Sequence, residues 1–158
     1  MPDLELAVSA TTRRPRPGET HGVDYWFLSE GEFDERVRAG DFVEHAQYSG
    51  RRYGTLRSEL ETRGSAGRPV VLEIEVQGAR QIRAAMPETV QVFIAPPSRE
   101  ALRARLIGRG TDDADQVEQR LATAERELEA QDEFTRVVVN DRLEDAVDEL
   151  EGIVRGAI

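Results

Sequence analysis

The sequence has 158 residues, of which 39% are hydrophobic, and it predicts one globular domain with a substantial core. Its formal charge of −10 argues against binding to nucleic acid or to an anionic membrane, because both need a net basic surface. There is no cysteine, and His21 and His45 are the only histidines, so we expect no metal site made by the chain alone. No membrane-spanning apolar run or signal-peptide segment occurs, and we expect a cytoplasmic protein.

The first part of the chain alternates short strands with loops and helices. Its arginine, proline and glycine residues between Arg13 and Gly22 predict a loop. The polar and mostly β pattern of residues 13–63 is typical of an inserted lobe. The elements predicted here are a strand at Leu4–Ser9, an aromatic strand at Asp24–Leu28, a helix capped by Ser29 and closed by Gly40, a hairpin over Asp41–Thr55 that turns near Ser49 and Gly50, and a helix ending at Gly64.

From Arg68 onward, strands alternate with helices. The nearly continuous β-branched run "PVVLEIEV" indicates a strand buried on both faces. This alternation predicts an α/β fold with a parallel sheet. The predicted strands span residues 69–76, 90–95 and 135–140, and the predicted helices span residues 78–85, 98–109, 114–130 and 143–155.

Arg13 and Arg16 lie three residues apart in the proline-stiffened loop, with Ser9 before them and Tyr25 after. Guanidinium groups bind phosphate through two parallel hydrogen bonds, and the prolines reduce the entropy lost in presenting them. The loop therefore predicts a site for a phosphate-bearing ligand. The alternative is a solvated charged loop, which is the usual role of a lone pair of arginines.

Three polar residues of the predicted hairpin suggest recognition of a base and a phosphate. A buried carboxylate at Glu44 would accept hydrogen bonds from the N1–H and the exocyclic amine of guanine. Tyr53 and Thr55, on the other strand, would reach a phosphate oxygen. The alternative is a set of exposed polar strand residues.

Two further clusters lie in the second part of the chain. Glu73 and Glu75 are two residues apart, so we expect them on one face at the carboxyl end of a buried strand, where ligands of open α/β sheets bind. Arg105, Arg109 and Arg120 flank a glycine-bounded segment, which predicts a mobile lid with phosphate-stabilising arginines. The alternative for these arginines is salt bridging along helix surfaces.

These motifs, in this order, resemble guanylate kinase, the nucleoside-monophosphate kinase that transfers the ATP γ-phosphate to GMP. The resemblance runs from Pro2 to the end and rests on "SATTRRPRPGETHGVDYWF", "GDFVEHAQYSGRRYGT", "VVLEIEVQGA", "FIAPPS", "RLIGRGTDDADQVEQRL" and "VVVND". It implies a single domain with a P-loop-kinase-like parallel sheet and helices. Within it, residues 1–12 and 66–158 would form the core, residues 13–65 a mixed β lobe that binds GMP, and residues from about 105 to 125 a helical lid.

The resemblance also implies roles for individual residues. Glu44 matches the position that binds guanine, and Glu75 matches an aspartate that also contacts this base. Glu73 matches an acidic position near magnesium and the phosphates, and Asn140 matches a residue beside the adenine. The GMP phosphate would be surrounded by Ser9, Arg13, Arg16, Tyr25, Tyr53 and Thr55, and the transferring phosphoryl group would be neutralised by Arg105, Arg109 and Arg120.

The sequence departs from the family at its start. The family begins with a strand, the phosphate-binding loop G-x-x-x-x-G-K-[ST] and a helix, whereas these 158 residues contain no such loop and no lysine. Because that loop holds the ATP phosphates and Mg²⁺, we expect ATP and Mg²⁺ to bind only if this segment is supplied, and the chain alone to be an inactive kinase. The first strand would lie inside the sheet, so its absence predicts self-association through strand completion.

Three hypotheses remain open at this point. The first is a guanylate-kinase-like domain that binds GMP, or a phosphorylated peptide as in the related domains of eukaryotic scaffold proteins. The second is an ordinary ATP:GMP phosphotransferase whose N-terminal phosphate-loop segment is missing from this chain. The third is a remnant without function. Reading the coding sequence in frame upstream of Met1 separates the first two.

Overall fold

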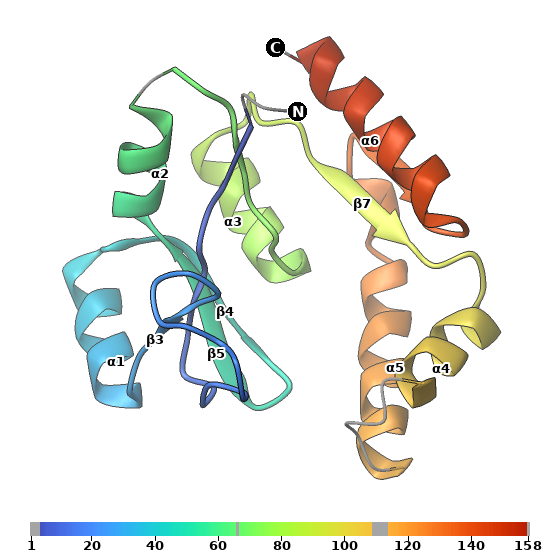
Figure 1. The fold of residues 1–158 in the computed structure, drawn as a ribbon, viewed down its shortest axis with the longest axis horizontal. Helices are drawn as coiled ribbons and strands as arrows, with labels where there is room; N and C mark the ends of the chain where they lie inside the picture. The colour runs from blue at the N-terminus through green and yellow to red at the C-terminus, as the bar shows by residue number, and fades with distance from the viewer. Residues whose placement is uncertain (1–3, 66, 109–113, 158) are drawn as a thin grey trace. The chain divides into compact units, whose positions relative to one another are not determined.

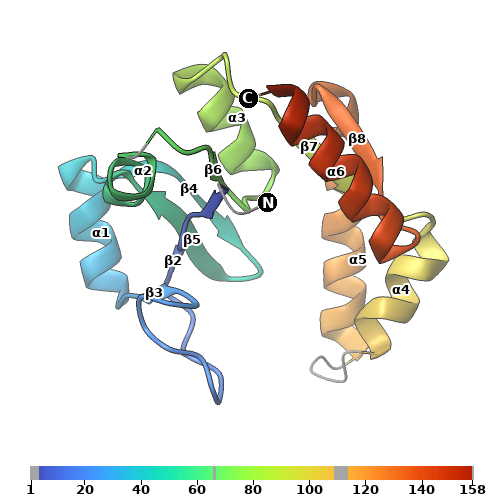
Figure 2. The same ribbon diagram turned by 45° about the horizontal axis from the view of Figure 1, so that its top comes forward.

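The computed structural model describes residues 4–65, 67–108 and 114–157, with no account of the side chains of residues 114–116. Its contacts divide the chain into two compact units, Met1–Thr89 and Val90–Ile158 (Figures 1 and 2). Among the described residues, no helix is long and apolar enough to cross a membrane. The expected division into core, GMP lobe and lid stays a prediction.

The first unit contains a four-stranded sheet in the order β3-β2-β5-β4. Its strands are β2 (Ala10–Thr11), β3 (Trp26–Phe27), β4 (Phe42–Tyr48) and β5 (Arg51–Leu56). β4 and β5 form the predicted hairpin, and the turn residues Ser49 and Gly50 both have positive φ, at 50° and 72°. Two consecutive left-handed residues give the turn whose twist matches that of antiparallel strands, so this prediction is confirmed.

Helix α1 (Glu30–Ala39) begins and ends as predicted. The Ser29 side chain accepts a hydrogen bond from the Glu32 N–H, and the Glu32 carboxylate accepts one from the Ser29 N–H. Gly40 closes the helix in the left-handed conformation, with φ at 75°. The helix packs Phe33 against Phe42 of β4, with ring centroids 4.5 Å apart, and buries it completely. This contact places α1 on the core face of the sheet.

The rest of the first unit comprises β1 (Glu5–Leu6), α2 (Arg57–Gly64), β6 (Val70–Val71) and α3 (Val76–Ala85). β1 and β6 pair in parallel. Figures 1 and 2 show α1 and α3 on opposite sides of the β4–β5 hairpin. The hairpin therefore has a core side facing α1 and a second side facing α3.

Three strands are much shorter than predicted, and of the predicted aromatic strand Asp24–Leu28 only Trp26–Phe27 forms β3. Only Glu5–Leu6 of the predicted strand 4–9 is paired, and the predicted strand 69–76 is wrong beyond Val71. The chain leaves the strand there and starts helix α3 at Val76, because the Glu75 carboxylate accepts hydrogen bonds from two of the first N–H groups of the helix. Consequently, Glu73 and Glu75 do not share one face of a strand.

The second unit pairs β7 (Val92–Ala95) with β8 (Arg136–Val139) in parallel. Its helices are α4 (Arg99–Gly108), α5 (Ala114–Leu128) and α6 (Leu143–Ala157), with a short 3-10 helix, η1, at Gln131–Glu133. The apolar side chains of Leu102, Leu106, Val117 and Leu121 hold α4 against α5. The predicted alternation of strands and helices is confirmed, and each unit contains parallel strand pairs: β1 with β6 and β2 with β3 in the first unit, and β7 with β8 in the second.

Candidate functional site

A one-residue bulge in β4 determines which residues reach the candidate site. The pairing of β4 with β5 shifts between Phe42, which faces Leu56, and Glu44, which faces Thr55. In a regular strand, Phe42 and Glu44 would lie on the same face. The bulge lets Phe42 enter the core beside α1 while Glu44 points to the opposite face, as bulges near functional sites commonly do.

This second face carries several of the residues predicted to bind GMP. Paired residues of neighbouring strands lie on the same face, and Glu44 pairs with Thr55 while Thr11 pairs with Tyr53 and with Phe27. Because Tyr53 and Thr55 are two residues apart, they also point to one side. The structure therefore brings Glu44, Tyr53 and Thr55 together.

The Glu44 side chain is buried, with 3% of its residue surface exposed. One carboxylate oxygen accepts a hydrogen bond of 2.7 Å from the Thr55 hydroxyl. The other lies against the backbone of Gly78 in the first turn of α3, so that a Cβ at Gly78 would be 2.3 Å from Glu44 Oε2. Burial raises the pKa of Glu44; the Thr55 hydrogen bonds oppose this, and the nearby Glu75 carboxylate adds to it. A buried carboxylate with capacity to accept more hydrogen bonds suits a ligand with paired N–H donors.

Glu75 lies near Glu44 in a role that the sequence did not predict. Its carboxylate caps α3, accepting 2.9 Å and 2.6 Å hydrogen bonds from the N–H groups of Gln77 and Gly78. This cap fixes the first turn of α3 beside Glu44. Glu73 lies in the extended stretch between β6 and α3, and it is exposed.

The loop between Arg13 and Gly22 (the arginine loop) also meets this face of the sheet. The Arg13 guanidinium lies 5.2 Å from the ring centroid of Tyr25 and 5.8 Å from that of Phe27, and the rings of Tyr25 and Tyr53 contact each other edge-on. Arg13 forms two hydrogen bonds with the Glu19 carboxylate, at 2.8 Å and 3.0 Å. These bonds raise the pKa of Arg13 and, with one from the Arg16 N–H, lower that of Glu19. Arg13 is thus held in place by Glu19 and the aromatic rings.

Arg16 and Ser9 occupy less constrained places in the same region. Arg16 is exposed, and its backbone N–H donates to Glu19 at 2.6 Å. Ser9 is half-buried, two residues before Thr11, and its carbonyl accepts a hydrogen bond from the Trp26 N–H. Among the predicted phosphate ligands, Arg16 is therefore the arginine most accessible to a ligand.

Glu59 of α2 ties together the two ends of the arginine loop. One carboxylate oxygen accepts hydrogen bonds from the Val8 N–H and from Arg63, and the other accepts one from the Trp26 indole N–H. Val8 precedes the loop and Trp26 follows it. Glu59 could not be identified from the sequence, because no local pattern distinguishes this glutamate from its neighbours in a polar helix.

The second unit contains Asn140 and the arginines predicted to act on the transferring phosphoryl group. The Arg105 guanidinium of α4 donates to the Asp141 carbonyl at 3.2 Å, and the backbone N–H of Asn140 donates to Ala95 at the end of β7. Arg105 and Asn140 are therefore brought to the same end of the β7–β8 pair. Arg120 is half-buried in α5, and Arg109 lies outside the described residues.

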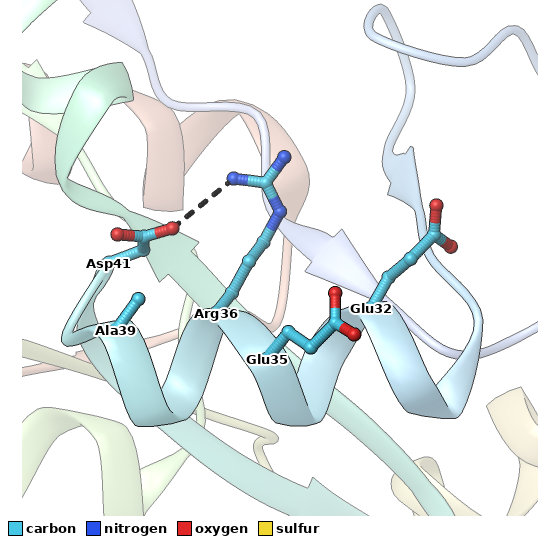
Figure 3. Close-up of a pocket in the computed structure, with 5 residues that line it drawn as sticks. All are labelled: Glu32, Glu35, Arg36, Ala39 and Asp41. Carbon is cyan, nitrogen blue, oxygen red and sulfur yellow. Dashed lines mark hydrogen bonds and ion pairs between the residues drawn. The ribbon is translucent and has the colours of Figure 1, made fainter.

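A hollow on the outer side of α1 is unrelated to these residues (Figure 3). It is lined by Glu32, Glu35, Arg36, Ala39 and Asp41, with an ion pair of 3.5 Å between Arg36 and Asp41. Glu32 already serves in the helix cap. Among the described residues, no three histidine, aspartate or glutamate side chains gather in a way that would hold a metal ion.

Two residues of α3 beside the candidate site were likewise not predictable from the sequence. Gly78 has no side chain and so leaves the space that the Glu44 carboxylate occupies. Gln81 forms hydrogen bonds with the backbone of His45, the residue after Glu44. A glycine in the first turn of a helix was the only available signal for Gly78. Nothing in the local sequence indicates the distant partner of Gln81.

Comparison with known proteins agrees with the predicted resemblance. A family model described as guanylate kinase matches residues 3–157. The guanylate kinase of Streptomyces coelicolor is 52% identical over 149 residues, covering 94% of this chain and 76% of that protein. That of Prochlorococcus marinus is 50% identical over 153 residues, covering 97% and 81%. The crystal structure of guanylate kinase from Anaplasma phagocytophilum superposes with a TM-score of 0.84 at 34% identity, covering 98% of this chain and 76% of that one.

Proposed function

Because the chain belongs to the guanylate kinase family, we propose that it binds GMP and serves in the ATP-dependent phosphorylation of GMP to GDP. The observation that carries the proposal is the buried Glu44 carboxylate, which faces the first turn of α3 on the same face of the sheet as the aromatic rings that hold the arginine loop. Of the hypotheses that the sequence left open, the phosphotransferase agrees best with relatives of about 50% identity.

Guanine recognition in this proposal depends on the charge state of Glu44. Ionised, its carboxylate has acceptor positions beyond the one that Thr55 uses, and guanine offers its N1–H and its 2-amino group as a matching pair of donors. Adenine lacks the N1–H and carries its amino group elsewhere. Glu75 supports this contact by holding the first turn of α3 beside Glu44, and we include its carboxylate among the groups proposed to contact the base.

Phosphate binding in this proposal uses the arginine loop. Arg16 reaches the phosphate as an exposed guanidinium, and Arg13 supplies a second charge from the place where Glu19 and Tyr25 hold it. The hydroxyl groups of Tyr25, Tyr53 and Ser9 add further donors. Thr55 donates its one hydroxyl proton to Glu44 in this structure, so it would have to turn away from Glu44 to donate to the phosphate. A phosphorylated peptide would use the same arginines, so such a ligand would compete with GMP.

The residues proposed for the ATP side are Arg105, Arg109, Arg120 and Asn140, together with Glu73 near the Mg²⁺ that accompanies ATP. Arginines stabilise the charge that spreads over the oxygens of a transferring phosphoryl group. Phosphoryl transfer also needs a cradle for the ATP phosphates, and the G-x-x-x-x-G-K-[ST] motif is not among these 158 residues. We therefore expect turnover to depend on the presence of that motif in the polypeptide assayed.

Calorimetry and a coupled ADP-release assay test the proposal. The assays use the 158-residue chain and, separately, the product of its gene with any coding sequence that precedes Met1 in frame. We expect GMP to bind the 158-residue chain, AMP to bind at least about tenfold more weakly, and Glu44→Ala to abolish the preference. GMP binding without discrimination against AMP, or unchanged in Glu44→Ala, would show that the proposed site is wrong.

Two further outcomes refine the proposal. Turnover by a product that includes the motif supports the phosphotransferase, whereas turnover by the 158-residue chain alone would overturn the requirement for that motif. Analytical ultracentrifugation of the same samples tests the strand-completion dimer, and a single monomeric species would count against it.

A further inference from the structure

Among the described strands, β4 is at the edge of the four-stranded sheet, so one side of its backbone is paired with none of them. Gln81 of α3 covers this side at His45. Its Nε2 donates to the His45 carbonyl at 2.7 Å, and its Oε1 accepts from the His45 N–H at 3.2 Å. A side-chain amide thus forms the same pair of hydrogen bonds that a residue of an adjacent strand would form.

Gln77, one turn earlier in α3, makes a weaker contact with the same strand. Its Nε2 donates to the Gln47 carbonyl at 3.4 Å, and Gln77 is exposed whereas Gln81 is half-buried. The Gln77 carbonyl also accepts a hydrogen bond of 3.3 Å from Gln81 Nε2. Both donors of the Gln81 amide are therefore used, and its orientation is fixed.

The two hydrogen bonds between the Gln81 amide and the His45 backbone (the His45 clamp) also constrain Glu44, the residue before His45. Glu44 lies between the β-bulge on one side and the clamped His45 peptide on the other. Its carboxylate lies so close to Gly78 that a Cβ there would be 2.3 Å away, which leaves little freedom in the distance between β4 and α3. Any loosening of this strand against the helix would change the direction in which the carboxylate points.

We propose that Gln81 is a positioning residue for base recognition: its side-chain amide clamps strand β4 to helix α3 and thereby aims the Glu44 carboxylate at the paired N–H donors of guanine. This inference rests on the proposed function, because it assigns the guanine contact to Glu44. It adds a residue that touches no substrate and acts through the backbone of His45.

The proposal predicts a loss of discrimination between two closely similar nucleotides. GMP offers an N1–H and a 2-amino group, whereas IMP has the same phosphate and N1–H but no 2-amino group. A carboxylate that is turned away loses the two-point contact with GMP, while a single hydrogen bond tolerates the change of direction. A variant that only weakens the fold would reduce the affinity for both nucleotides by the same factor.

The test compares Gln81→Met with Gln77→Met, because methionine keeps the length of glutamine but has no strong hydrogen-bonding group. We expect Gln81→Met to weaken GMP binding about tenfold and IMP binding less than about threefold. Gln77→Met should change both affinities less than about twofold. Equal losses of GMP and IMP affinity in Gln81→Met would overturn the proposal. It would also be overturned if the two substitutions changed the ratio of GMP to IMP affinity equally.

Amide hydrogen exchange gives a reading that needs no nucleotide. The His45 N–H should exchange at least about tenfold faster in Gln81→Met than in the parent, and at the parent rate in Gln77→Met. An unchanged rate in Gln81→Met would show that the clamp does not form. If Gln81→Met does not fold, Gln81→Glu replaces it: it keeps the acceptor for the His45 N–H, loses the donor, and should give an intermediate ratio, so a parental ratio would overturn the proposal.

Failure of the two proposals is distinguishable. If the parent binds GMP no better than AMP, the proposed function is wrong, and the guanine role of Gln81 falls with it. If the parent prefers GMP and Gln81→Met retains the parental ratio of GMP to IMP affinity, the proposed function stands and only the positioning role is refuted.

Discussion

Replacing Glu59 with glutamine should destabilise the first unit, although it only exchanges one carboxylate oxygen for an NH₂ group. Glu59 is 7% exposed, and its two carboxylate oxygens accept hydrogen bonds from Val8, Trp26 and Arg63 at 2.9, 2.9 and 2.6 Å. All of these partners are donors. A glutamine amide supplies one oxygen and one NH₂ group, so in either orientation the NH₂ group points at a donor.

The size of the loss in the free energy of unfolding depends on which donors lose their acceptor. A buried donor left without a partner costs about 1–3 kcal/mol. The Arg63 side chain is 28% exposed and keeps a second partner in Glu5 at 3.4 Å, so its part of the loss is small. We therefore expect Glu59→Gln to lower the free energy of unfolding by about 2–3 kcal/mol. With an m value of about 1–1.5 kcal/mol/M, the urea midpoint should fall by roughly 2 M.

Urea titration followed by tryptophan fluorescence measures this loss. Trp26 is the only tryptophan in the sequence, and it reports on the unit that contains Glu59. Glu61→Gln, on an exposed position of the same helix, removes the same charge and should change the free energy of unfolding by less than about 0.5 kcal/mol. A loss in Glu59→Gln no larger than that of the control would refute the argument.

The pH dependence gives an independent check of the same carboxylate. Burial alone would raise the pKa of Glu59, but the hydrogen bonds from Arg63, Val8 and Trp26 outweigh it, and the pKa lies below its usual value. A lowered folded-state pKa gives stability that is present above the unfolded pKa of about 4.3 and is lost as the pH falls through the folded pKa. The difference in stability between the parent and Glu59→Gln should therefore shrink below about pH 4. A difference that stays constant would contradict this.

Three further substitutions test the site directly. Gly78→Ala should weaken GMP binding at least about tenfold while the protein stays folded, because the new Cβ displaces the Glu44 carboxylate and alanine favours the helix. The control is Gly152→Ala, whose added Cβ would meet no described atom outside its own helix backbone within 4 Å, and unchanged affinity in Gly78→Ala would contradict the geometry. Arg16→Ala should abolish measurable GMP binding by calorimetry and Arg14→Ala should not, whereas equal effects would refute the assignment. Since burial raises the pKa of Glu44, the stability that this group contributes is present below the unfolded pKa and is lost as the pH rises through the folded pKa. Glu44→Gln should therefore be more stable than the parent at pH 7, and the difference between their thermal unfolding midpoints should close near pH 4. A difference that widens towards low pH would contradict the raised pKa.

Elements with signals in consecutive residues could be predicted from the sequence. Ser29 and Glu32 form a capping box and Gly40 ends the same helix, so α1 matches its prediction at both ends. Ser49 and Gly50 fix the turn of the hairpin. These features depend on hydrogen bonds between residues a few positions apart, and the sequence contains all that is needed for them.

The order of the motifs was equally available from the sequence. The arginine loop, the hairpin with Glu44 and the "LEIEVQG" segment are linear patterns, and they identified the family that the comparisons then showed. The strand predicted at residues 69–76 failed because a run of apolar and β-branched residues suits a buried strand or the approach to a helix equally well. The Glu75 cap decides between them, since it starts α3 at Val76.

Only the tertiary structure decided how the candidate site is assembled. The bulge between Phe42 and Glu44 exists because one side chain is needed in the core and the other on the opposite face. Glu44 meets Gly78, and Gln81 meets His45, across 34 and 36 residues of sequence. Such contacts depend on where two elements come to lie in space, and the hydrogen-bonding capacity of a glutamate or glutamine does not specify its partner. The sequence by itself thus determined the family and the residue types predicted for the candidate site, and packing determined which carboxylate is buried and what holds it.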